Sequence, residues 1–293
     1  MIDFNIAALT NRALLAVNES ERTRRTDSLD QILHEAESNG LLDLVAYLRA
    51  QEARLASNFE EALRLLDQAL ELAPRFVAAH LLKVAVLTES GQYHDALGWS
   101  NHVMQNIALS NYAIFHLNKG VVYERLGKYQ EARLAYLKAI DESETYDLAF
   151  HYLLLICSKM KAWEDILAVS ERVREKFKDK PTVLTRTAVA ILQAGEGALK
   201  EGRPEWDISL SEEARKFTEI VVSLEPKNPT AWYNLACTYA RLGRRDDAVG
   251  TLRKTLDMEK AKGEDRLRKK AAVDEDFAKL READVFKQLL EVG

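Results

Sequence analysis

The sequence offers few residues that could carry out chemistry, and their spacing does not assemble them into a known reactive motif. Metal-binding helices often carry an H-E-x-x-H pattern, and many zinc sites pair cysteines separated by two residues. Neither pattern occurs around the six histidines: His34, His80, His94, His102, His116 and His151. The sequence therefore predicts no bound metal and no cofactor.

Cys157 and Cys237 are the candidate nucleophiles. A cysteine needs a positioned base to act as one, and the sequence around neither cysteine supplies a clear base. We expect Cys157 in the core and Cys237 on an open helix face. Carboxylates are abundant, but helix surfaces use them for solubility and for i, i+4 ion pairs. We therefore expect a protein that is not an enzyme.

The composition points to a helical protein without a nucleic-acid partner. The chain has 293 residues, of which 47% are hydrophobic and 30% charged, with 12 glycines and 5 prolines. Few helix breakers and many strong helix formers favour an all-α fold. The net charge is −5, and the one short basic cluster, residues 266–270, lies among acidic residues. A solvated helix face explains this cluster better than a phosphate-binding patch.

Cysteine content and hydropathy suggest a cytoplasmic location. Two cysteines make no disulfide framework, and Asp3, Asn11 and Arg12 interrupt any apolar leader near the start. No apolar run approaches the roughly 18 residues of a membrane span. We expect a soluble protein that does not contact membranes.

Two series of small or apolar residues repeat along the chain with one period. The first series is Ala50, Val84, Gly120, Leu154, Ala188 and Ala236. The second series is Ala62, Ala96, Ala132, Ile166, Ala214 and Ala248. Both advance by 34 residues, apart from one step of 36 and one of 48. A fixed period of this length predicts a stack of similar helix pairs.

This pattern resembles the tetratricopeptide repeat (TPR), a helix–turn–helix unit of 34 residues. The best unit contains Trp232, Ala236, Tyr239, Gly243 and Ala248. The resemblance covers about residues 41–260 and implies a right-handed superhelical solenoid of about six units. Small residues let the paired helices cross closely, and the glycines suit the turns between them.

Three segments depart from the repeat. Residues 1–40 form an N-terminal helical segment, either a degenerate repeat or a cap. Residues 195–208 are an insert between two helices, after which Ser209 and Glu212 form a capping box that restarts the helix. Within the insert, Trp206 either anchors a partner or folds back onto the edge of the solenoid.

Residues 261–293 are expected to close the array with short capping helices, as a solenoid requires. They resemble the C-terminal segment often found closing bacterial TPR arrays, which suggests a bacterial source. Phe277, Leu280, Phe286 and Leu290 would cover the last repeat. The family's prolines near Glu275 and around residues 283–284 are absent.

The resemblance places the first helix of each unit on a concave groove. Arg125, Lys159, Arg186 and Arg241 would make its middle and C-terminal half basic. Asparagine side chains there could bond a peptide backbone through both amide groups. The full set of groove candidates is Asn118, Arg125, His151, Tyr152, Lys159, Arg186, Tyr233, Asn234, Cys237 and Arg241. The same pattern also fits ordinary solvated residues on a wide groove.

These observations favour a non-catalytic scaffold or adaptor that binds a protein or peptide partner, with an acidic segment suited to a basic groove. Two alternatives stay open. An uncapped N-terminal end, or the apolar stripe from Leu29 to Ala36, could pair two arrays in a self-assembling structural protein. The chain could also be a regulatory subunit or peptide sensor that acts on a separate enzyme.

Overall fold

The computed structural model describes residues 9–17, 19, 27–109 and 111–291, and every regular element among them is a helix. This confirms the predicted all-α class. The chain divides into two compact units, unit 1 (Met1–Glu142) and unit 2 (Ser143–Gly293), which are described separately.

Unit 1 consists of helix pairs joined by short turns. Its helices are α2 (Asp27–Ser38), α3 (Leu42–Leu55), α4 (Phe59–Leu72), α5 (Val77–Glu89), α6 (Tyr93–Asn106), α7 (Ala113–Arg125) and α8 (Tyr129–Glu142). The pairs are α3 with α4, α5 with α6, and α7 with α8. The first helices of successive pairs also touch, α3 with α5 and α5 with α7.

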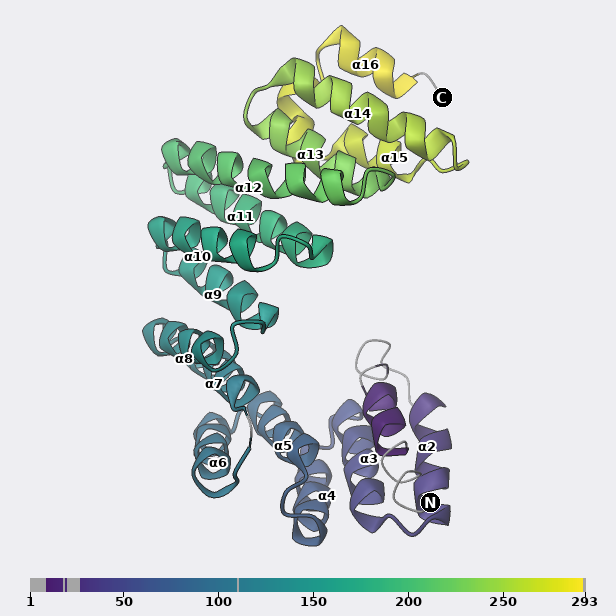
Figure 1. Ribbon diagram of the computed structural model, residues 1–293, viewed down its shortest axis with the longest axis vertical. Helices are drawn as coiled ribbons and strands as arrows, with labels where there is room; N and C mark the ends of the chain where they lie inside the picture. Colours follow the sequence, from purple (N-terminus) through teal and green to yellow (C-terminus); the bar gives the residue numbers. More distant parts are fainter. Residues whose placement is uncertain (1–8, 18, 20–26, 110, 292–293) are drawn as a thin grey trace. The chain divides into compact units, whose positions relative to one another are not determined.

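Unit 2 continues the same arrangement. Its paired helices are α9 (Asp147–Lys159), α10 (Trp163–Lys176), α11 (Pro181–Lys200), α12 (Pro204–Leu224), α13 (Pro229–Arg241) and α14 (Arg245–Lys260). They follow one another as antiparallel pairs (Figure 1). After them come α15 (Arg266–Val273), the 3-10 helix η1 (Glu275–Leu280) and α16 (Asp284–Glu291).

Every member of the two marker series is buried, which confirms their predicted packing role. The closest crossing is in the α7–α8 pair. A Cβ atom added to Gly120 would lie 2.3 Å from Cε1 of Tyr136, a side chain that is fully buried. Only glycine leaves room for this ring between the two helices.

The turn inside each helix pair uses left-handed backbone. Gly91, Gly127 and Gly243 have φ angles of 79°, 70° and 71°, as predicted. Ser57 and Lys161 take the same conformation, with φ angles of 60° and 57°. A Cβ atom makes this region unfavourable, so the repeat geometry holds these two residues in place against their own preference.

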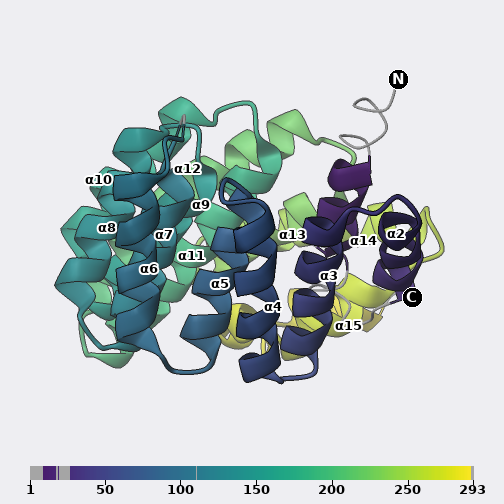
Figure 2. The same ribbon diagram turned by 90° about the horizontal axis from the view of Figure 1, so that it is seen from below.

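The N-terminal residues add a further helix pair to unit 1. Helical residues 9–17 and α2 share one apolar core with α3 and lie beside it (Figure 2). Ala16 stands 34 residues before Ala50, so the first marker series extends to it. Leu29, Ile32 and Ala36 are buried in this core. The stripe proposed to pair two arrays is therefore not available, because it holds the first helix pair together.

Residues 195–208 are helical except for the short turn at 201–203 between α11 and α12, so the interpretation of the insert as a long loop is wrong. Helices α11 and α12 have 20 and 21 residues, each seven more than α9 and α10. The fourteen extra residues therefore lengthen both helices by about two turns each. Ser209 lies inside α12 and donates to the Glu205 carbonyl at 2.9 Å, so it does not cap a helix.

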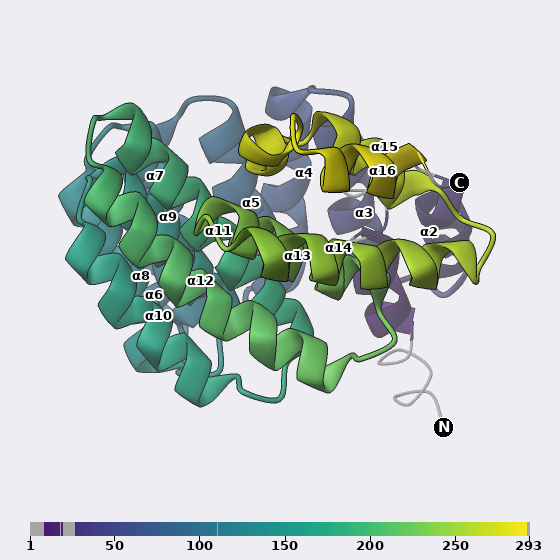
Figure 3. The same ribbon diagram turned by 90° about the horizontal axis from the view of Figure 1, so that it is seen from above.

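The last three helices cover the end of unit 2 (Figure 3). η1 packs on α13, and α15 and α16 pack on α14. Phe277, Leu280 and Phe286 are buried there as predicted, and Leu290 is partly buried. Arg268 donates to the carbonyls of Leu289 at 3.0 Å and Leu290 at 3.2 Å. Part of the basic cluster at 266–270 thus fastens α16 to α15.

We expect Gly120→Ala to destabilise the protein by about 1–3 kcal/mol, because the new methyl group overlaps the immobile Tyr136 ring. Gly98→Ala is the matched control, since it also lies in a helix but has no atom within 4 Å of the added Cβ. That change should stabilise by up to about 1 kcal/mol. Thermal and urea unfolding measure both. Equal effects of the two variants would contradict the close crossing.

Candidate functional site

A pocket of about 250 Å³ opens between the first helices of the last two helix pairs of unit 2. Helices α11 and α13 form its sides, and the segment from α15 to η1 closes one end. Its lining residues are Ala188, Val189, Leu192, Gln193, Glu196, Thr218, Asn234, Cys237, Arg241, Lys270, Asp274, Glu275 and Asp276. We call it the α11–α13 pocket.

The pocket has an apolar floor and a polar edge. Ala188 is buried and Leu192 is half-buried, whereas Val189 is 40% exposed. Gln193 and Asn234 bring primary amides to the pocket from α11 and α13. An amide group offers both donors and an acceptor, as a peptide backbone requires. An exposed aliphatic side chain beside such groups suits contact with a segment of another chain.

Arg241 forms the base of the pocket and is locked in place by two carboxylates. Its Nη2 lies 2.6 Å from Asp207 Oδ1, and its Nη1 lies 3.4 Å from Asp276 Oδ1. Only 12% of its side chain is exposed. Gly195 permits this approach, because a Cβ atom there would lie 2.9 Å from Asp207 Oδ1. The extra turns of α11 and α12 thus supply the residues that fix Arg241.

The closing segment is held by a small polar cluster. Tyr233 donates its hydroxyl to Asp274 Oδ2 at 2.8 Å, and the Asp276 amide donates to Asp274 Oδ1 at 3.2 Å. The Tyr233 and Phe277 rings meet edge to face with centroids 5.9 Å apart. Burial raises the pKa of the Tyr233 hydroxyl. This tyrosine is therefore a neutral anchor for η1.

Cys237 completes the cluster as a buried thiol. Burial, together with the nearby Asp276 and Asp274 carboxylates, raises its pKa well above the usual value for a cysteine. Burial also raises the pKa of Asp276, against the opposing effect of Arg241, and Asp274 adds to the rise. A nucleophilic cysteine needs the opposite environment, which lowers its pKa. The arrangement does not favour covalent catalysis.

Cys237, Asp274 and Asp276 also bring three potential metal ligands within 4.8 Å of one another. The neighbouring cations compete with a metal ion for these groups. Lys270 Nζ lies 3.6 Å from Asp274, and Arg241 pairs with Asp276. The hydrogen bonds of the two carboxylates are those that seat η1 on α13, so the cluster is suited to holding the closing segment.

Three family models of the tetratricopeptide repeat match the chain, at residues 47–101, 113–146 and 231–266. These stretches lie on α3 to α6, on α7 and α8, and on α13 and α14. This chain is a tetratricopeptide-repeat protein. The resemblance read from the spacing of the two marker series is thereby confirmed.

A TPR repeat-containing protein of Methanocaldococcus jannaschii is 32% identical over 120 residues, which are 41% of this chain and 36% of that protein. The match therefore spans about a third of that relative. The bacterial source suggested by the closing segment stays a prediction.

Three solved structures similar to this TPR protein share 19–20% sequence identity with it. MamA is 19% identical, with 76% of this chain and 95% of that chain covered and a TM-score of 0.37. YrrB, described as a TPR protein with an unusual peptide-binding site, is 20% identical, with coverages of 66% and 92% and a TM-score of 0.41. A TPR protein from Thermus thermophilus is 19% identical, with coverages of 63% and 99% and a TM-score of 0.49. At these identities the likeness concerns the fold alone.

Three of the candidates predicted from sequence lie together in unit 2 of this TPR protein. Asn234, Cys237 and Arg241 line the α11–α13 pocket. Tyr233 and Cys237 were expected to face an open groove, but they are 0% and 5% exposed. That expectation is wrong because η1 covers this part of α13. Sequence reasoning missed Asp207, which determines the position of Arg241.

The remaining candidates lie elsewhere on first helices. Arg186 on α11 pairs with Asp147 at the start of α9. Burial of the His151 ring lowers the pKa of that residue, and the positive charge of Arg186 lowers it further. The other four first-helix candidates are half-buried Tyr152 and exposed Lys159 on α9, and two residues of unit 1, half-buried Asn118 and exposed Arg125 on α7. A role of these residues in partner binding stays a prediction.

Two ring side chains share one structural role at equivalent positions of the TPR units. His80 Nε2 lies 2.9 Å from the Pro74 carbonyl, and Trp232 Nε1 donates to the Pro226 carbonyl at the same distance. Burial lowers the pKa of His80, and likewise that of His116. His80 therefore holds the start of α5 as Trp232 holds the start of α13.

Trp206 lies near the start of α12 and is half-buried. It lines a second pocket of unit 2, of about 330 Å³, together with Lys161, Trp163, Glu164, Glu201 and Arg203. This places it beside the turn between α9 and α10 and the start of α10. Its prediction as a partner anchor stays open, because the pocket leaves the indole partly accessible.

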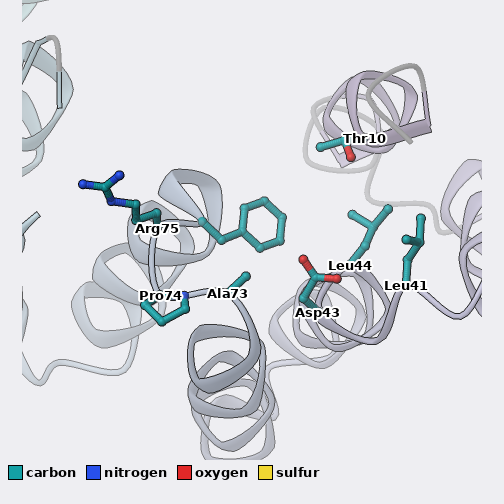
Figure 4. A pocket seen from close by; sticks show the side chains of 8 residues that line it. Thr10, Leu41, Asp43, Leu44, Ala73, Pro74 and Arg75 are labelled. Atoms are coloured by element: carbon teal, nitrogen blue, oxygen red, sulfur yellow. The ribbon is translucent and has the colours of Figure 1, made fainter. Parts of the chain in front are cut away.

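Unit 1 contains a larger apolar pocket, of about 440 Å³. Leu41, Asp43 and Leu44 at the start of α3 lie on one side, and the turn before α5 lies on the other (Figure 4). Thr10 reaches it from the N-terminal helical residues. Its walls are mostly apolar, so it provides less polar specificity than the α11–α13 pocket.

No helix within the described parts of the chain is long and apolar enough to cross a lipid bilayer.

We expect Phe277→Ala to expose Cys237, because it removes the ring that packs η1 onto Tyr233. The change should cost about 3–5 kcal/mol of packing. In a Cys157→Ala background, which leaves one thiol, Cys237 should react with Ellman's reagent at least about tenfold faster than in the parent. Phe115→Ala, an equally buried ring in unit 1, is the control and should leave the rate unchanged. Rapid labelling of the parent protein would contradict the burial of Cys237.

Proposed function

We propose that this TPR protein is a non-catalytic scaffold or adaptor, and that its α11–α13 pocket binds a segment of a partner protein. The observation that carries the proposal is the exposed aliphatic side chain of Val189 beside the Asn234 and Gln193 amides in one pocket. The aliphatic floor provides burial for an apolar side chain of the partner. The amides provide hydrogen bonds for its backbone.

The size and rigidity of the pocket support this function. A volume of about 250 Å³ lies below the range of about 300–1,000 Å³ that is typical of drug-sized ligands. It therefore suits one or two side chains of a longer segment. The pocket is preformed by packed helices and by the ion pairs of Arg241, which reduces the entropy lost on binding.

The chemical environment supports a role without catalysis. The only cysteine of the pocket has a raised pKa and is covered by η1. The two carboxylates next to this cysteine, Asp274 and Asp276, are engaged with Tyr233, Arg241 and Lys270. A protein partner is also favoured over nucleic acid, since the chain is acidic overall and Arg268 is tied to α16.

The cations on the first helices bear on the charge of the partner segment. The predicted acidic segment depended on a groove made basic by four cations. Of these, Arg186 and Arg241 are neutralised by carboxylates of unit 2. The basic character of this half of the groove therefore has little support.

Selection of short random peptides against the immobilised protein tests the function. We expect the selection to yield peptides that bind the parent protein. Val189→Asp should lower their affinity at least about tenfold, a loss of ~1.4 kcal/mol, because it places a charge on the apolar floor. Asn234→Ala should weaken them by a smaller factor.

Leu199→Asp is the matched control. Leu199 lies on the same helix and is 48% exposed, but it is outside the pocket. It should leave affinity unchanged, and circular dichroism should show all variants folded. Peptides that bind the Val189→Asp protein as tightly as the parent would place the binding surface elsewhere.

A further inference from the structure

We infer that the α11–α13 pocket selects a partner segment in which a lysine or arginine lies next to an aliphatic residue. This inference rests on the proposed function, since it concerns the chemistry of the segment bound at that site. It is opposite in sign to the acidic segment expected from the sequence.

The first argument is the balance of charge around the pocket. Four carboxylates line it, and they come from Glu196 on α11 and from the three consecutive acidic residues 274–276. Two cations line it, Arg241 and Lys270. The lining therefore carries an excess of negative charge, and a neighbouring acid, Asp207, lies directly behind Arg241.

The second argument is that the two cations are already engaged. Arg241 is held between Asp207 and Asp276 with 12% of its side chain exposed. Lys270 Nζ is 3.6 Å from Asp274 and 4.6 Å from the centroid of the Tyr233 ring. An acidic partner would have to break these contacts, and it would also approach the exposed carboxylates of Glu196 and Glu275.

The third argument is that two of the carboxylates remain accessible. The Glu196 side chain is 52% exposed and pairs with Lys200 on its own helix. The Glu275 side chain is 86% exposed, and its contact with Arg281 is 3.3 Å long. Surface ion pairs of this kind are weak and exchange readily. Both carboxylates can therefore turn to a cation supplied by a partner.

The fourth argument is the position of the aliphatic floor relative to these carboxylates. Glu196 follows Val189 by seven residues and Leu192 by four on α11, so the three lie along one helix face. Lysine and arginine pack their methylene stems on apolar surface while the charged end reaches polar groups. The methylene stem of a lysine or arginine in the partner would pack on Leu192, and its charged end would lie near the Glu196 carboxylate. The exposed charges should contribute selectivity more than affinity.

Selection from a library of short random peptides tests the inference with three forms of the full chain. The first is the parent protein, which should enrich peptides with lysine or arginine beside an aliphatic residue. The second is Glu196→Lys combined with Glu275→Lys, which should lose that preference and enrich acidic peptides. The third is the control, Glu144→Lys combined with Glu282→Lys, which carries the same charge change.

The control residues are suited to this comparison. Their side chains are 63% and 91% exposed, each forms a surface ion pair in unit 2, and neither lines the pocket. The control protein should enrich the same peptides as the parent. For a synthetic peptide from the parent selection, exchange of its basic residue for glutamate should weaken binding at least about tenfold, and raised salt should weaken binding of the original peptide.

The outcomes separate the inference from the function on which it rests. If no peptide is enriched, or if Val189→Asp leaves binding intact, the proposed function of the pocket fails. If peptides bind in the pocket but show no basic preference, or prefer acidic residues, the function stands and this inference is overturned. Retention of the basic preference by the Glu196→Lys, Glu275→Lys protein would also overturn it.

Discussion

The guanidinium group of Arg241 joins three elements whose packing forms the candidate site. It lies on α13 and pairs with Asp207 of α12 and Asp276 of η1. A buried cation without carboxylate partners would be costly, so the three elements are held in one arrangement. Tyr233 reinforces this through its hydrogen bond to Asp274. The shape of the pocket and the position of the closing segment follow from these contacts.

The repeated helix crossings make this arrangement rigid. Each helix pair buries small or apolar residues at its crossing, and in the α7–α8 pair the space admits only glycine beside Tyr136. Because neighbouring pairs pack on one another within each unit, the first helices are held on a fixed backbone. The functional surface can then vary in side chains while the scaffold stays constant. This explains why the best-formed repeat, around Trp232, contributes mostly packing residues.

The sequence predicts those features that depend on local pattern. The marker series, the left-handed glycines and the aromatic residues of the closing segment all follow from spacing or from backbone preference. The sequence predicts a loop at residues 195–208 because glycines and a proline usually interrupt helices. Here Gly195 provides room for Asp207 within a continuous helix, and Pro204 begins the next helix, where proline is tolerated.

The placement of Arg241, Tyr233 and Cys237 depends on contacts that local pattern does not encode. Asp207 and Asp276 are 34 and 35 residues away from Arg241 along the chain, and Asp274 is 41 residues from Tyr233. A repeat pattern assigns these side chains to an open face, because it describes each unit without the segment that covers the last one. The negative charge of the pocket depends on these long-range pairings, because they neutralise Arg241 and bring the acidic residues 274–276 to the pocket.

Site-specific photo-crosslinking tests the central claim, that the α11–α13 pocket is where a partner binds. A photo-reactive phenylalanine analogue is placed at Val189 in one protein and at Leu199 in another, and each is irradiated in cells that express it. Both side chains are exposed on α11, but only Val189 lines the pocket. The account predicts a discrete protein adduct from position 189 and none from position 199. Adducts from position 199 alone, or identical adducts from both, would contradict it.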